Sequence, residues 1–207
     1  MKLSSIKILK VPVKLIGVLA TTATVFALAP AAAQACNYSG AKQVFAPWGD
    51  RHHYVLGPDG GFEAGASGWS LSGGAATVTG NESYYLNAAA DSRSLALPAG
   101  SSAGSPPVCM SLDTPIFRMF ARNTGDPSSR LRVEAVYKLL GLVRTKAVST
   151  VTAGPNWAPT QQMSTVLSLA TIVGTLIPSN IQIRITPLDS KGQWQVDDLY
   201  IDPYARR

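Results

Sequence analysis

Arginine and glutamate recur at alternate positions in three segments of the 207-residue sequence. In residues 116–122, 131–138 and 181–186, every second residue is apolar and most residues between are polar or basic. Successive side chains of a strand point to opposite faces, so we expect the polar set on one face. Guanidinium groups pair well with carboxylates and phosphates, which suits an acidic ligand. A row of Arg, Glu and Arg is also the pattern of a cross-strand charge ladder. The set is Arg118, Arg122, Arg132, Glu134, Gln182 and Arg184.

Two adjacent acids, Asp197 and Asp198, interrupt the otherwise apolar segment 196–201. Carboxylates in such a segment need hydrogen bonds, a cation or an exposed face to offset the cost of desolvation. Neighbouring side chains of a strand diverge, so these two acids do not form the facing carboxylate pair of a glycoside hydrolase.

The remaining reactive side chains form no catalytic signature. His52 and His53 are the two histidines, and on a strand they point to opposite faces, which makes shared metal binding difficult. We expect one packed and one solvent-facing histidine. The sequence has no phosphate-binding glycine loop. We therefore predict that the protein is not an enzyme.

Residues 1–35 have the organisation of a secretory signal peptide. Four lysines without an acid precede an apolar run, and Ala33-Gln34-Ala35 completes the cleavage pattern. Threonines and a proline dilute the run, which disfavours a membrane-spanning helix. We predict a secreted domain of residues 36–207 with no membrane partner. Cleavage lowers the net charge from +6 to +2, which disfavours nucleic acid as a partner.

The two cysteines, Cys36 and Cys109, would reach an oxidising compartment after export. A disulfide between them is the default expectation there. Lipidation of Cys36 is the alternative, because this residue would be the first after cleavage. Ala33 stands where a lipidation signal usually has leucine, so the disulfide is the favoured prediction.

The arginines and acids described above are expected to lie on short strands. Charged residues are 14% of the chain, and turn residues separate its short periodic segments. No segment keeps a 3.6-residue period, and the β-branched content of the apolar segment 165–176 favours a strand. One apolar and one polar face per strand is what a two-layer sandwich requires. We predict an all-β fold, a single β-sandwich of two antiparallel sheets.

Two motifs near the ends resemble the galactose-binding-like β-sandwiches, a jelly-roll group that includes many carbohydrate-binding modules. Phe62-Glu63-x-Gly65 precedes Gly68-Trp69, Asn156-Trp157 follows, and Val196-Asp197-Asp198-Leu199-Tyr200-Ile201 comes last. Residues 44–203 also resemble small secreted proteins of actinobacteria. The resemblance implies a jelly-roll sandwich.

The resemblance also implies a structural calcium site. In such modules a glutamate of the early motif and an aspartate of the last strand meet at one edge. The matching positions are Glu63 with Asp197 or Asp198. Hard oxygen ligands suit Ca²⁺. Local hydrogen bonding of Glu63, with only one aspartate buried, is the alternative.

The function implied by the resemblance is that of a secreted, non-catalytic module for a glycan or an anionic cell-wall polymer. Such modules stack aromatic rings on sugars, and Trp48, Tyr84, Tyr137 and Trp157 are candidates. A structural or interaction protein of the cell surface, which would show no saturable sugar binding, is the alternative. The predicted ligand-binding residues are Arg118, Arg122, Arg132, Glu134, Trp157 and Arg184.

Overall fold

The computed structural model describes residues 38–109, 116–139, 141–164 and 180–202. Their strands pair antiparallel into two sheets, and the helical element in these ranges is a single 3₁₀ turn, η1 (Ala46–Trp48). The prediction of an all-β fold with two antiparallel sheets is confirmed. No helix in the described ranges is long and apolar enough to cross a membrane.

The first sheet has seven strands, and its centre is built from segments far apart in the sequence. β7 (Ile116–Asn123), β13 (Gln193–Asp202) and β4 (Arg93–Pro98) lie side by side, with β10 (Ala158–Pro159) and β3 (Ala76–Thr79) at the ends. β1 (Val55–Leu56) also pairs with β13, and β11 (Met163–Ser164) pairs with β7.

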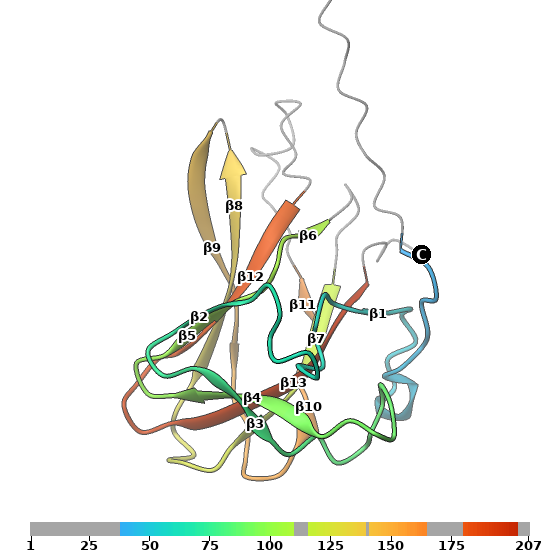
Figure 1. Cartoon of the computed structure of the whole chain (residues 1–207), viewed down its shortest axis with the longest axis horizontal. Helices are drawn as coiled ribbons and strands as arrows, with labels where there is room; N and C mark the ends of the chain where they lie inside the picture. Colours follow the sequence, from blue (N-terminus) through green and yellow to red (C-terminus); the bar gives the residue numbers. More distant parts are fainter. Residues whose placement is uncertain (1–37, 110–115, 140, 165–179, 203–207) are drawn as a thin grey trace, which may run out of the picture. The chain divides into compact units, whose positions relative to one another are not determined.

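The second sheet has six strands. Its order is β2 (Ser70–Ser72), β5 (Ser102–Gly104), β12 (Asn180–Pro187), β8 (Leu131–Leu139) and β9 (Leu142–Val151), with β6 (Val108–Cys109) also paired to β12. β8 and β9 form a long hairpin (Figure 1).

The main hydrophobic core lies between the sheets. It contains the predicted apolar faces of β7, β8 and β12, whose residues alternate with the polar set. The predicted face assignment within each of these strands is therefore confirmed. The residues are Phe117, Met119, Ala121, Leu131, Val133, Ala135, Ile181, Ile183 and Ile185.

A second apolar cluster covers the other face of the seven-stranded sheet. We call it the outer aromatic cluster; its buried members are Phe45, Tyr54, Ile116, Phe120, Trp157 and Tyr200. Phe45 is at its centre, with ring centroids 5.8 Å from Phe120, 5.0 Å from Tyr54 and 5.7 Å from Tyr200. Residues 42–56 therefore act as a cover that packs on the sheet.

Several predictions concern residues outside the described ranges. The signal peptide, Cys36 and the segment 165–176 lie there. Cys109, in β6, is not a free thiol. The pairing of Cys36 with Cys109 and the domain boundary at residue 35 stay predictions.

Candidate functional site

A polar pocket lies beside the cover. It has a volume of about 440 Å³ and combines groups from the segment after η1 with groups near β11 and at the end of β13. Gly49 turns the chain out of η1 with φ +80, a left-handed conformation that favours glycine. The lining residues are Gly49, Asp50, Arg51, His52, His53, Gln162 and Asp202.

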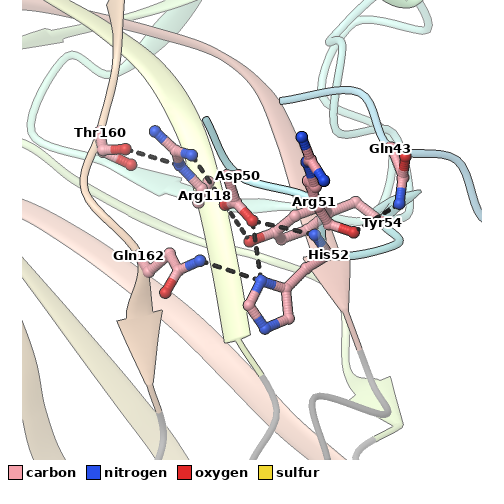
Figure 2. Close-up of polar contacts among 8 residues, drawn as sticks. All are labelled: Gln43, Asp50, Arg51, His52, Tyr54, Arg118, Thr160 and Gln162. Atoms are coloured by element: carbon pink, nitrogen blue, oxygen red, sulfur yellow. Dashed lines mark hydrogen bonds and ion pairs between the residues drawn. The ribbon is translucent and has the colours of Figure 1, made fainter. Parts of the chain in front are cut away.

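Asp50 is the hub of the polar contacts in Figure 2. Its side chain is 5% exposed, and its Oδ2 accepts hydrogen bonds from Tyr54 Oη at 2.7 Å and Arg118 Nη1 at 2.8 Å. Its Oδ1 lies 2.8 Å from His52 Nδ1 and accepts a bond from the His52 backbone N–H. Arg118 also donates from Nε to the Thr160 carbonyl at 2.7 Å. The network ties the cover to β7 and to the segment before β11.

The network keeps Asp50 ionised. Burial alone would raise the pKa of its carboxyl, but hydrogen bonds from Gln162, Tyr54, Arg118 and the His52 backbone outweigh burial and hold that pKa well below its usual range. Burial and the bond to Asp50 raise the pKa of Tyr54. Asp50 and Arg118 thus form a buried, charged pair with a structural role.

The rim of the pocket carries the groups that face solvent. Arg51 and Gln162 are exposed, and His52 and His53 are half-buried. Both histidines line this one pocket, so the expectation that they point to opposite faces is wrong. The reason is local, because residues 51–53 are not in a strand and do not alternate as strand residues do. No pattern in the sequence pointed to Gln162.

A second polar region, the Tyr84 surface, lies farther along the outer face of the seven-stranded sheet. We define it by Tyr84, Arg122, Trp157 and Gln195. Tyr84 is 47% exposed, yet its ring is supported by Trp48, with centroids 5.0 Å apart, and by Phe120, at 5.5 Å. Its hydroxyl donates to the Trp157 carbonyl at 3.4 Å.

Arg122 completes the Tyr84 surface. Its guanidinium carbon lies 4.9 Å from the centroid of the Trp157 ring, and its Nε donates to Gln195 Oε1 at 2.8 Å. No described residue accepts a hydrogen bond from its Nη groups. The surface therefore presents a guanidinium fixed on Trp157, and the exposed Tyr84 contacts the same tryptophan through its hydroxyl.

The other predicted arginines lie elsewhere. Arg132 and Arg184 are on the six-stranded sheet, where their Nε atoms lie 3.4 Å and 3.0 Å from the two oxygens of Glu134. The expectation of a single arginine-lined face is wrong, because β7 joins one sheet while β8 and β12 join the other. Arg132, Glu134 and Arg184 form the charge ladder that was the alternative. Of the predicted ligand-binding residues, the structure brings Arg122 and Trp157 together.

The predicted calcium ligands lie in two different environments. Glu63 is exposed, and its Oε1 accepts hydrogen bonds from the backbone N–H groups of Ser92, at 2.8 Å, and Arg93, at 2.7 Å. Asp197 and Asp198 are both buried. The alternative expectation, that only one of these aspartates is buried, is therefore wrong. Within the described ranges, no three His, Cys, Asp or Glu side chains gather as a metal-binding group.

An irregularity of β13 explains why both aspartates are buried. The register with β7 shifts between Asp197 and Tyr200, and Asp198 has φ +49, so the usual alternation fails here. Asp197 accepts hydrogen bonds from the backbone N–H groups of Glu82 and Asp198, each at 2.9 Å. The sequence did not indicate Glu82, which is fully buried beside the pair.

Asp197, Asp198 and Glu82 form what we call the acid group. Asp198 is the member whose carboxylate lacks hydrogen bonds. Both of its carboxylate oxygens are buried, and neither has a hydrogen-bond partner of normal geometry among the described residues, although the nearby Asn87 backbone N–H acts to lower its pKa. Burial, followed by the charges of Glu82 and Asp91, raises its pKa to about 7. Burial and the Asp198 charge raise the pKa of Asp197 to about 8, against the hydrogen bond from the Glu82 backbone.

Comparison with known proteins identifies the fold. No protein-family model and no curated protein matches the sequence. Solved structures match: the N-terminal CBM22-1–CBM22-2 tandem of Xyn10C from Paenibacillus barcinonensis is 13% identical, with a TM-score of 0.52, over 81% of this chain and 48% of that one. The chain has the fold of the carbohydrate-binding modules.

Two further structures are similar at lower TM-scores. The C-terminal family 22 carbohydrate-binding module of Clostridium thermocellum Xyn10B is 16% identical over 71% of this chain and 93% of that chain, with a TM-score of 0.49. The module TmCBM61, in complex with β-1,4-galactotriose, is 14% identical over 70% of this chain and 95% of that chain, with a TM-score of 0.47. The predicted carbohydrate-binding-module fold is confirmed.

Asp198, in the acid group, is the described carboxylate with the fewest hydrogen bonds beside the predicted calcium position. Two buried, unpartnered carboxylate oxygens on Asp198 offer the hard ligands that Ca²⁺ takes. Gly61 leaves room beside them, because a Cβ at this position would lie 3.1 Å from Asp198 Oδ1. Asp198 therefore fits a cation better than Glu63, whose carboxylate already serves two backbone N–H groups.

Proposed function

We propose that the chain is a secreted, non-catalytic module that binds a glycan, with preference for acidic sugars, at the Tyr84 surface. The observation that carries the proposal is that the exposed Tyr84 side chain and the guanidinium of Arg122 both contact Trp157. An aromatic face packs on the apolar face of a sugar, while guanidinium N–H groups bind carboxylates and hydroxyls. The carbohydrate-binding-module fold supports the same conclusion.

The Tyr84 surface is rigid before a ligand arrives. Trp48 and Phe120 hold the ring of Tyr84, while Gln195 and Trp157 hold the guanidinium of Arg122. Side chains that are already ordered lose little conformational entropy on binding, so their contacts contribute more to affinity.

The polar pocket is a second polar site on the same sheet. Its solvent-facing groups, the amide of Gln162 and the imidazole of His52, suit sugar hydroxyls.

Binding to soluble polysaccharides tests the proposal. Affinity electrophoresis on polygalacturonate and on xylan should show saturable retention, stronger on the acidic polymer. Tyr84→Ala should weaken binding about tenfold, the size expected for a lost aromatic contact. Tyr85→Ala is the matched control, because Tyr85 is also exposed but has no ring contact within the described ranges. Absence of saturable binding, or equal losses in both variants, would favour a structural protein of the cell surface.

We also propose a structural calcium ion at the acid group. Asp198 would hold it, with Asp197 and Glu63 as neighbouring carboxylates, and the ion would neutralise charge that is otherwise costly to bury. The melting temperature should rise with calcium and fall with chelator, and Asp198→Asn should remove the difference. A melting temperature that chelator leaves unchanged in the parent protein argues against the ion.

Export and the disulfide belong to the same proposal. Residues 1–35 would direct secretion, and Cys36 would pair with Cys109 in the exported protein. Intact mass of the secreted chain tests both points. A mass that begins at Cys36 and lacks two hydrogens supports them, whereas an acylated N-terminus shows lipidation of Cys36 instead.

A further inference from the structure

The tip of the β8–β9 hairpin exposes apolar surface. Leu142 is 55% exposed and Val143 62%, the largest values among the large apolar residues of the described ranges. They follow Gly141, whose φ of +77 turns the chain between the two strands. Other exposed large apolar side chains, Leu71 and Leu188 among them, are single residues or lie at the Tyr84 surface.

The tip extends beyond the rest of its sheet. β8 pairs with β12 as far as Tyr137, opposite Ile181, and the last pairs of β8 are with β9 alone among the described strands. Figure 1 shows the end of the hairpin passing the end of β12. Leu142 and Val143 therefore lie where another surface can reach them.

Cations flank the apolar tip. Lys138 and Arg144 are exposed, and Lys146 follows on β9. Residues 135–151 contain no acid, and Glu134 lies farther from the tip, where it is paired with two arginines. The tip thus combines aliphatic side chains with two exposed cations, Lys138 and Arg144, that form no ion pair with a described acid.

We propose that this hairpin tip docks peripherally on an anionic lipid bilayer. Leu142 and Val143 would enter the boundary between headgroups and acyl chains, and Lys138 and Arg144 would contact lipid phosphates. A polysaccharide fits less well, because aliphatic side chains offer no flat ring for stacking. A second copy of the chain also fits less well, because two tips would bring like charges together. The proposal revises the expectation that the exported domain has no membrane partner.

Vesicle co-sedimentation tests the docking with the exported domain. Vesicles of phosphatidylcholine with about one third phosphatidylglycerol should bind the protein, and added salt should weaken the binding. Pure phosphatidylcholine vesicles should bind little. Lys138→Gln together with Arg144→Gln should weaken binding by more than about tenfold, since each cation contributes about 1 kcal/mol near such a surface.

The apolar contribution has its own matched control. Leu142→Ser with Val143→Ser should lose about tenfold or more in vesicle binding, and Leu71→Ser, on an exposed strand elsewhere, should lose none. Retention on polygalacturonate should stay unchanged in all these variants, because the Tyr84 surface is on the other sheet. Failure of the docking is thus distinguishable from failure of the glycan proposal.

Two results would overturn the docking proposal. One is equal binding of the parent protein and the Leu142→Ser, Val143→Ser variant to the anionic vesicles. The other is a concentration-dependent dimer in sedimentation velocity that the same variant abolishes, which would identify a second copy as the partner of the tip.

Discussion

The outer faces of the two sheets arise from the same sequence pattern and have different environments. On β7, Arg118 and Arg122 alternate with core residues just as Arg132 and Glu134 do on β8. The cover packs on the outer face of β7, whereas the outer face of β8 and β12 is open, with the side chains of Arg132 and Arg184 42% and 37% exposed.

The cover changes what an arginine does. Under the cover, Arg118 is shielded from water and pairs with Asp50. This buried pair contributes to the stability of the fold. Where the outer aromatic cluster ends, Arg122 keeps its guanidinium over the Trp157 ring, which suits ligand binding. On the open face, Arg184 is 37% exposed and pairs with Glu134, whose side chain is only 10% exposed, so solvent screens this pair from the arginine side. The position of a strand in the fold, and not its alternation, decides the role.

The largest expected effect comes from removal of the centre of the cover. Phe45 is fully buried among aromatic rings, so Phe45→Ala leaves a cavity and should lower the free energy of unfolding by about 4 kcal/mol. Phe117→Ala, in the core between the sheets, should cost a similar amount. Urea denaturation measures both. A loss well below 1 kcal/mol for Phe45→Ala would show that the cover is not part of the folded core.

The next comparison is between the buried and the open charge pairs. Asp50→Asn keeps the shape of the side chain but leaves buried Arg118 without a counter-charge, and should cost about 3 kcal/mol. Glu134 is also buried, with a side chain 10% exposed, but both of its arginines reach solvent, so Glu134→Gln should cost less than Asp50→Asn, about 1 kcal/mol. Both are measured by denaturant unfolding. Equal losses would contradict the distinction between the two faces.

The sequence was sufficient for the fold class because alternation is local. The apolar faces of β7, β8 and β12 could each be identified from a few neighbouring residues, and each is in the core. The sequence could not assign these strands to sheets. Sheet membership depends on pairings between distant segments, such as Arg118 with Tyr200, and alternation specifies a face without specifying a partner.

The errors at the candidate site have the same physical origin. Alternation places Asp197 and Asp198 on opposite faces, but the shifted register and the left-handed backbone at Asp198 bury both. A non-glycine residue with positive φ is uncommon, although aspartate is among those that adopt it. Glu82 approaches Asp197 from a distant loop, so no local pattern could indicate the contact.

A smaller effect should appear in the pH dependence of stability. It distinguishes the acid group from the Asp50 network, because the two respond to pH in opposite directions. Without calcium, the raised pKa values of Asp197, about 8, and Asp198, about 7, mean that the folded state resists their ionisation. Stability should therefore fall as pH rises from about 5 to about 8.

Thermal unfolding in chelator checks this prediction. Asp198→Asn should make the profile less steep over this range, because an amide does not ionise and Asp197 alone then titrates. Asp50 acts in the opposite direction, since its pKa is lowered and its contribution is lost only in acid, as pH falls below the usual aspartate range. Stability that rises between pH 5 and pH 8 in chelator would show that the acid pair is not the controlling group.

The smallest expected effect, and the most direct comparison of the two faces, is on ligand binding. Arg122→Gln removes a guanidinium held beside the Trp157 ring and should weaken retention on polygalacturonate about tenfold, with less effect on xylan. Arg184→Gln removes a guanidinium that is similarly accessible but paired with Glu134 on the open face, and should leave retention unchanged. Both substitutions lower the net charge by one, so non-specific attraction to the polymer would be reduced equally in the two variants. A larger loss from Arg184→Gln would indicate that the glycan binds on the six-stranded sheet. The outer aromatic cluster would then have only a structural role.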